Sequence, residues 1–248
     1  MMTIFRLKIK SIENMKNMRL NLKKSGLIVG IIFISGLFLT SCLDDDTNNY
    51  LPENAGWIAF INASPDSENL KFYSNGNSIN LGGIDYSQFL NYSAFEIGNH
   101  NLSVQSGTGE ELDTISLNVE LNHWFSVYAV NNLADLELVA YSDNFITPDI
   151  NKASIKFIQL SPDLPQVKLA IEGINDNLGT YLFKQASPFT EVNETFHKNL
   201  YLIDAVSNDT IFTKQVDFTS GITYAVFSKG FYETENTDQG LDVQVIQY

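Results

Sequence analysis

The hydrophobic positions after residue 54 follow the two-residue period of β-strands. In residues 115–121 and 167–171, aliphatic side chains alternate with polar neighbours. Such alternation predicts strands with one buried face, and no stretch after residue 42 keeps the 3.6-residue period of a helix. Turn-forming segments such as Asn75-Gly76 and residues 106–109 (SGTG) separate the runs. Short strands at about ten-residue spacing predict an all-β chain built from antiparallel β-sandwiches.

The pattern occurs twice along the chain. Residues 57–66 (WIAFINASPD) recur as residues 154–163 (SIKFIQLSPD), a separation of 97 residues, and His100 and His197 share that spacing. Repetition at one spacing is typical of a duplicated unit. We therefore expect two tandem antiparallel sandwiches of six or seven strands each, over residues 52–146 and 150–248.

Each repeat contains a Ser-Pro-Asp triplet, at residues 64–66 and 161–163. A recurring serine and carboxylate could belong to a site. A turn is the simpler interpretation, because proline fixes φ at the second turn position and Asp can bond backbone amides two residues on.

The first 41 residues have the pattern of a secretory signal. Seven lysines and arginines precede an uncharged apolar stretch, residues 26–40. As a helix, those fifteen residues would span about 22 Å, which is less than a hydrocarbon core of about 30 Å. We expect residues 1–41 to be removed, and a start at Met15 or Met18 would leave a signal of ordinary length.

Leu39-Thr40-Ser41-Cys42 resembles the lipobox that lipoprotein signal peptidase recognises. The resemblance implies cleavage before Cys42 and a lipid on its thiol, with palmitate or similar acyl chains. Two or three buried acyl chains hold a protein far more firmly than one. Cys42 is the only cysteine, so the exported fold must depend on its own core.

An acidic run, Asp44-Asp45-Asp46, follows the cysteine. It resembles the surface-export signal of lipoproteins from Bacteroidetes-type bacteria, which implies display on the outer face of the outer membrane. The alternative is a solvated tether. Either way, residues 42–54 form a polar tether that could hold the fold nearly 40 Å from the bilayer.

Removal of the signal leaves eight basic and 28 acidic residues, a formal charge of −20. Such a surface repels phosphate backbones and anionic headgroups, so nucleic-acid binding and peripheral membrane binding are disfavoured. The expected contact with the bilayer is the acylated Cys42.

The opening of the first repeat, FINASPDSENLKFYSNG, and the later segments Tyr92 to Phe95 and Gly98-Asn99-His100 resemble the DUF4397 domain. The resemblance covers residues 57–131 and, more weakly, 154–230. It implies an Ig-like β-sandwich, often in tandem, of exported bacterial proteins and lipoproteins, and no particular activity. In the second repeat Thr195 replaces Gly98.

The sequence contains no zinc motif, Walker loop, dinucleotide fingerprint or nucleophile elbow, so we expect no metal, no cofactor and no enzyme activity. Asp-Thr-Ile at 113–115 and 209–211 resembles an O-glycosylation sequon of Bacteroidetes, which implies glycans on Thr114 and Thr210. A turn leading into a strand explains the same residues equally well.

Together these features predict a lipid-anchored outer-membrane protein, displayed on the cell surface, that acts as a non-enzymatic binding or spacer module for a glycan or a protein. Two alternatives stay open: a structural accessory on the periplasmic face, and a hydrolase whose site the sequence does not reveal. Trp57, Trp124 and Tyr232 could stack on sugars, although core packing is the better explanation for the two tryptophans.

Overall fold

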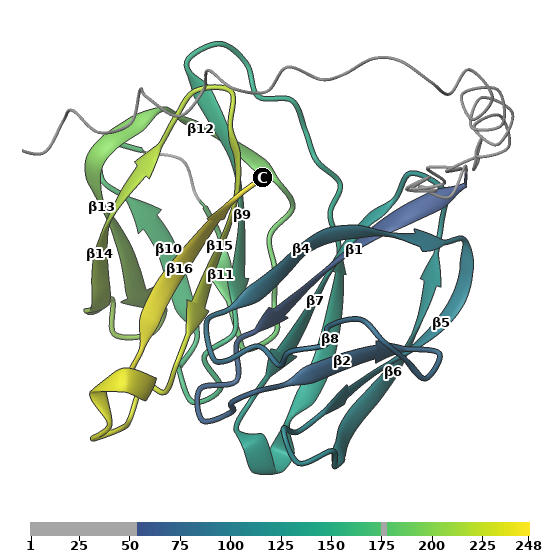
Figure 1. Cartoon of the computed structure of the whole chain (residues 1–248). Helices are drawn as coiled ribbons and strands as arrows, with labels where there is room; N and C mark the ends of the chain where they lie inside the picture. Colours follow the sequence, from purple (N-terminus) through teal and green to yellow (C-terminus); the bar gives the residue numbers. More distant parts are fainter. Residues whose placement is uncertain (1–53, 175–177) are drawn as a thin grey trace, which may run out of the picture. The chain divides into compact units, whose positions relative to one another are not determined.

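The computed structural model describes residues 54–174 and 178–248, and these residues form strands joined by turns (Figure 1). The first eight strands are β1 (Ala55–Asn62), β2 (Lys71–Ser74), β3 (Asn77–Ser78), β4 (Phe89–Glu96), β5 (Gly98–Gln105), β6 (Glu111–Val119), β7 (Trp124–Val130) and β8 (Glu137–Ser142). The next eight are β9 (Lys152–Gln159), β10 (Val167–Ile171), β11 (Thr180–Tyr181), β12 (Thr190–Asn193), β13 (Thr195–Asp204), β14 (Thr210–Phe218), β15 (Thr223–Lys229) and β16 (Asp242–Gln247). The described helices are two short 3-10 turns, η1 (Leu133–Asp135) and η2 (Thr237–Gln239).

The strands form four sheets of four. The first repeat contributes sheets of order β4-β1-β7-β8 and β3-β2-β5-β6, and the second contributes β12-β9-β15-β16 and β11-β10-β13-β14. The predicted all-β fold of two sandwiches is therefore confirmed. Each described repeat has eight strands rather than the six or seven expected. The short strands β3 and its counterpart β11, of two residues each, were not predicted.

Each repeat also contains one parallel pair, which the prediction of antiparallel sheets did not include. β1 runs parallel to β7, and β9 runs parallel to β15. These pairs occupy the middle of their sheets, where both neighbours supply hydrogen bonds. Parallel strands require a long connection, and here the intervening strands of the repeat provide it.

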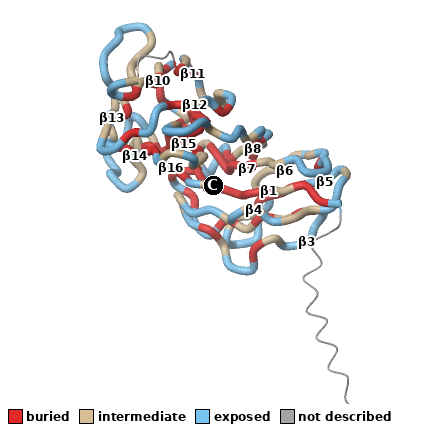
Figure 2. Tube along the Cα trace, turned by 90° about the horizontal axis from the view of Figure 1, so that it is seen from above, coloured by how far each residue is buried: buried red, intermediate tan, exposed pale blue. Residues whose placement is uncertain are grey.

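A third hydrophobic core lies between the two sandwiches. Besides the core inside each sandwich, one cluster combines side chains of β1 and β7 with side chains of β9, β15 and β16; it includes Tyr128, Ile158 and Phe227. The sheets that contain β1 and β9 are consequently covered on both faces. This explains why β1 and β9 are buried almost continuously and do not alternate. Figure 2 marks the buried stretches of β1 in red.

The Ser-Pro-Asp triplets form turns, as predicted, but the aspartates bond distant parts of the chain. Asp66 Oδ1 accepts from the backbone N–H of Leu133, at 2.7 Å. Asp163 accepts from the N–H groups of Tyr232 and Glu233, at 2.7 and 2.9 Å. In each repeat the carboxylate thus fixes the loop that follows the parallel partner strand.

The turn at Gly98 is built differently in the second repeat. Gly98 has a φ of 126°, which a residue with a side chain rarely adopts. The φ of its counterpart Thr195 is not positive, whereas His197, two residues further on, has a φ of 50°. The β13–β14 register shifts between Thr195 and Lys198. A bulge two residues downstream therefore replaces the glycine turn.

The predicted signal peptide, the lipobox residues Leu39, Thr40 and Ser41, Cys42, and Asp44-Asp45-Asp46 lie outside the described residues. No helix in residues 54–174 or 178–248 has the length and apolar character that a membrane crossing requires. Residues 50–248 form one compact unit, so the boundaries predicted at 52–146 and 150–248 stay a prediction.

The shared core predicts that both sandwiches unfold together. Phe227→Ala should lower the free energy of unfolding by about 3–5 kcal/mol, since it removes a fully buried ring. Both tryptophans, Trp57 and Trp124, belong to the first repeat. Tryptophan fluorescence and far-UV circular dichroism should therefore shift together in urea.

Phe218→Ala is a second test of joint unfolding, because Phe218 lies in the second sandwich's own core. It should shift the tryptophan transition as well. A shift in circular dichroism without a shift in fluorescence would show that the sandwiches unfold independently.

Candidate functional site

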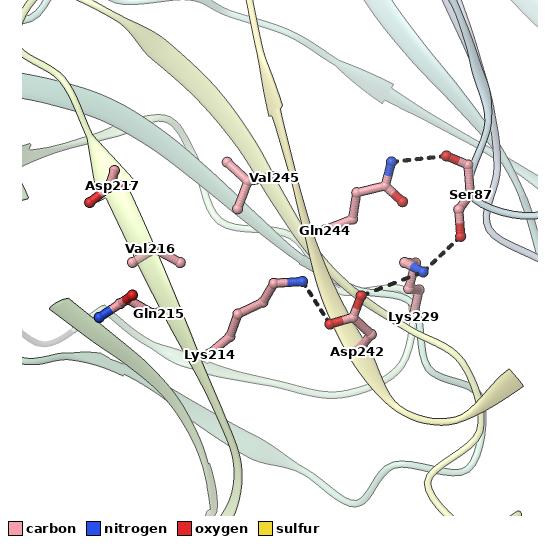
Figure 3. A pocket seen from close by; sticks show the side chains of 9 residues that line it. All are labelled: Ser87, Lys214, Gln215, Val216, Asp217, Lys229, Asp242, Gln244 and Val245. Carbon is pink, nitrogen blue, oxygen red and sulfur yellow. Dashed lines mark hydrogen bonds and ion pairs between the residues drawn. The ribbon is translucent and has the colours of Figure 1, made fainter. Parts of the chain in front are cut away.

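A cleft of about 470 Å³ lies between β14 and β16, the edge strands of the two sheets of the second sandwich (Figure 3). Ser87, from the segment that precedes β4 in the first repeat, closes one side. The lining residues are Ser87, Lys214, Gln215, Val216, Asp217, Lys229, Asp242, Gln244 and Val245. Most of these side chains are polar, so the cleft offers both hydrogen-bond donors and acceptors.

Two lysines converge on one carboxylate in the cleft. Lys214 Nζ is 2.8 Å from Asp242 Oδ1, and Lys229 Nζ is 3.7 Å from Asp242 Oδ2 (Figure 3). Because Lys214 and Asp242 are side chains of opposite edge strands, their ion pair bridges the two sheets. Both groups are more than a third exposed, so solvent weakens the attraction.

Lys229 is the buried member of the group. Its Nζ donates to Ser87 Oγ at 2.7 Å and lies 4.4 Å from the ring centre of Tyr86. Burial lowers the pKa of Lys229 below its usual value; the Asp242 carboxylate opposes that shift, and Lys214 adds to it. Burial and the nearby Asp242 carboxylate raise the pKa of Tyr86.

Gln244 joins the cleft to the first repeat. Its Nε2 donates to the Ser87 backbone carbonyl at 3.0 Å. Its Oε1 is buried and accepts no hydrogen bond from any residue that the structure describes. A buried amide oxygen without a donor is costly.

The corresponding edges of the first sandwich are joined. There β6 and β8 are in contact, and the backbone N–H of Leu138 on β8 donates to Asp113 Oδ2 on β6 at 2.7 Å. In the second sandwich the edges are bridged by two side chains, Lys214 and Asp242, instead of by a backbone donor. The space between these edges forms the cleft. The two copies of the module have thus diverged at this seam.

The cleft does not contain the buried carboxylate pair that a hydrolase of the glycosidase type would need. The Asp217 and Asp242 side chains are 52% and 39% exposed, and Asp242 is ion-paired with lysine. Within residues 54–174 and 178–248, no group of three or more His, Cys, Asp or Glu side chains could hold a metal ion.

The residues that the sequence predicted as sites lie elsewhere. Thr114 and Thr210 are exposed, on the edge strands β6 and β14. Trp57 and Trp124 stack on each other at a centroid distance of 4.9 Å, whereas Tyr232 is 43% exposed. None of these five lines the cleft.

Sequence reasoning did not identify the cleft residues. The one available signal was Lys229, a cation at the end of the apolar run Thr223–Lys229. A lysine that ends a buried strand requires a partner, but the sequence alone could not name Ser87, which is 142 residues away.

The fold and cleft define a two-sandwich β-protein with a polar groove between sheet edges. Residues 56–170 match the model of DUF4397, described as a domain of unknown function. The match confirms the resemblance predicted for residues 57–131. It ends within β10, so the resemblance predicted for the rest of the second repeat stays a prediction.

The comparison with curated proteins gave no match. Among solved structures, the chain is similar to a protein of Parabacteroides distasonis ATCC 8503 described as a candidate cell adhesion protein. The identity is 11%, the coverage is 79% of this chain and 98% of that chain, and the TM-score is 0.18.

Lys229 provides a pH prediction. Since its pKa is lowered, the unfolded chain binds more protons than the folded protein as the pH rises from the folded-state pKa to the usual 10.5. Over that window the wild type should gain stability relative to Lys229→Met. Urea unfolding between about pH 8 and about pH 11 measures the difference.

Lys152→Met is the matched control with the opposite sign. The Glu191 carboxylate bonds Lys152 and raises its pKa, so the stabilisation is complete below 10.5 and is lost as the pH rises through the higher folded-state value. Identical pH slopes for the wild type and Lys229→Met would contradict the prediction for Lys229.

Proposed function

We propose that the protein is a non-enzymatic binding module of the outer membrane, anchored through a lipid on Cys42, which binds a hydroxyl-rich ligand such as a glycan in the cleft of its second sandwich. The observation that carries the proposal is the open seam between β14 and β16. The first sandwich closes the same seam with a hydrogen bond from Leu138 to Asp113.

The chemistry of the lining supports a polyhydroxyl ligand. Lys214, the Gln215 amide and the Gln244 side chain offer donors and acceptors within one cleft, and Gln244 Oε1 has no donor among the described residues. Sugar hydroxyls both donate and accept, so they match such a mixed lining. A strongly anionic ligand fits less well, because Asp217 and Asp242 balance the two lysines.

The anchor is proposed from the sequence before the described fold. The lipobox residues, Cys42 and the acidic run Asp44–Asp46 favour export and lipid attachment. Residues 43–53 then separate the lipid from the first described residue, a reach of up to about 40 Å. We place the module on the cell surface; exposed threonines at 114 and 210 would there carry the proposed O-glycans.

A spacer role is the second candidate, and the third core supports it. Tyr128 and Phe227 lie in the cluster that packs the two sandwiches together, within one compact unit of residues 50–248. A module of this kind holds its two sandwiches at a fixed distance from each other. The spacer and binding roles are compatible, and only the latter depends on the cleft.

Cys42→Ala tests the anchor. In the native cells, labelled palmitate should enter the wild-type protein and not the variant, because the thiol is the acceptor of the lipid. External protease should remove the wild-type protein from intact cells. Absence of label in the wild type would refute lipidation, and full protection from protease would instead place the module on the periplasmic face.

Lys214→Ala and Gln244→Ala test the cleft. Each should weaken glycan binding about tenfold or more, since loss of a hydrogen bond to a bound ligand costs about 1–3 kcal/mol. A glycan array identifies the ligand, and titration calorimetry measures the change in affinity. Lys168→Ala is the matched control, because Lys168 is a lysine of the same sandwich that bonds Asn208 and does not line the cleft.

An array without hits would contradict sugar binding. Equal weakening by Lys168→Ala and Lys214→Ala would show that the general charge of the surface, rather than the cleft, determines the affinity.

A further inference from the structure

The junction between the two sandwiches contains a buried ion pair. Lys156 Nζ, on β9, lies 2.9 Å from Asp143 Oδ1, just after β8. The two side chains are only 5% and 2% exposed. Lys156 occupies the position of Ala59 in the first repeat, within a strand that is buried on both faces. A charged pair at such a position loses the hydration of both ions.

Aromatic rings enclose the pair. The Tyr141 and Phe189 ring centres lie 5.4 and 5.5 Å from Lys156 Nζ. Phe145 packs against Phe189 at 5.1 Å and against Tyr248 at 5.3 Å. The rings and the depth of burial shield the two side chains from bulk solvent.

The two carboxyl oxygens of Asp143 have different partners. Oδ1 faces the lysine, whereas Oδ2 accepts from Tyr92 Oη at 2.7 Å and from Ser126 Oγ at 2.5 Å. Burial and the Asp143 charge raise the pKa of Tyr92, so the phenol keeps its proton and remains a donor. Two fixed donors on one oxygen are the arrangement that stabilises an oxyanion.

We propose that Lys156 and Asp143 condense into an amide that joins the two sandwiches covalently. A proton passes from Lys156 Nζ to Asp143 Oδ1, which gives a neutral amine and a carboxylic acid. Nζ then attacks Cγ, and negative charge develops on Oδ2, where Tyr92 and Ser126 donate. The Cγ–Oδ1 bond breaks, and Oδ1 leaves as water with the transferred proton and a second proton from Nζ.

The step is balanced without an oxidant, a reductant or another reactant. One C–N bond forms, one C–O bond breaks and one water is released. Nζ also donates to the Ser142 carbonyl at 2.9 Å, and the single proton left on the amide nitrogen can keep that bond. Because the fold already holds the two groups together, the reaction avoids the entropy cost of a bimolecular condensation.

The amide would close a loop between residues 13 positions apart, across the connection between the two sandwiches. It would also remove two charges from the interior. Both effects would raise the free energy required to separate the two sandwiches above the contribution of the third core alone.

Peptide mass spectrometry of the full-length protein tests the proposal. Trypsin cannot cut after an acylated lysine, so digestion should yield residues 153–168 joined through Lys156 to the peptide that contains Asp143. The mass of the joined species should equal the sum of the two peptides less one water. Asp143→Ala should abolish it, and Tyr92→Phe should lower the linked fraction while the ring remains in place.

The pair Lys184–Glu137 is the internal control. It also connects the two repeats, at 2.7 Å, but its side chains are 34% and 44% exposed. Trypsin should cut after Lys184 in the same sample. Cleavage after Lys156 with both peptides at their unlinked masses would overturn the proposal and leave an ordinary buried ion pair. An unchanged linked fraction in Tyr92→Phe would overturn the role of the Tyr92 hydroxyl.

Discussion

The arrangement of this protein depends on the burial of its two middle sheets on both faces. A sheet of an ordinary sandwich faces a core on one side and water on the other, so its strands alternate. Here β1 and β9 contact their own sandwich core with one face and the shared core with the other. A charged side chain on these strands therefore requires a partner inside the protein. Lys156 meets this requirement through Asp143, and Asp143 in turn requires Tyr92 and Ser126.

The sequence predicted the strands that face water better than those that do not. The alternation in β6 and β10 identified half-buried strands correctly, because their outer faces stay partly exposed. The apolar runs of β1 and β9 revealed the repeat, but a continuous apolar run does not say what covers its second face. The parallel pairing of Trp57 with Trp124 joins strands more than sixty residues apart, and local periodicity contains no information about such a partner.

The aspartates of the Ser-Pro-Asp triplets illustrate the same limit. Turn chemistry correctly predicted the backbone of the triplets, since proline restricts its own φ whatever the surroundings. The partner of each carboxylate depends on the tertiary fold: Asp66 bonds Leu133, and Asp163 bonds Tyr232 and Glu233. In both copies the aspartate fixes the corresponding loop. This shared role explains why the triplet recurs although the sequence identity between the two repeats is low. The cleft was not predictable for a similar reason, because Ser87 comes from the other repeat.

The difference between the copies is the reason that we propose the ligand site in the second copy. In the first copy the seam is closed by a short bond from the β8 backbone to Asp113, and a backbone donor cannot rotate away. In the second copy the bridge is a pair of partly exposed side chains, Lys214 and Asp242, which can rotate toward a ligand without breaking a sheet. The buried Lys229 holds the base of this seam by its bond to Ser87. The first sandwich thus supplies a fixed wall, the second supplies the adjustable groups, and the shared core keeps the two in register.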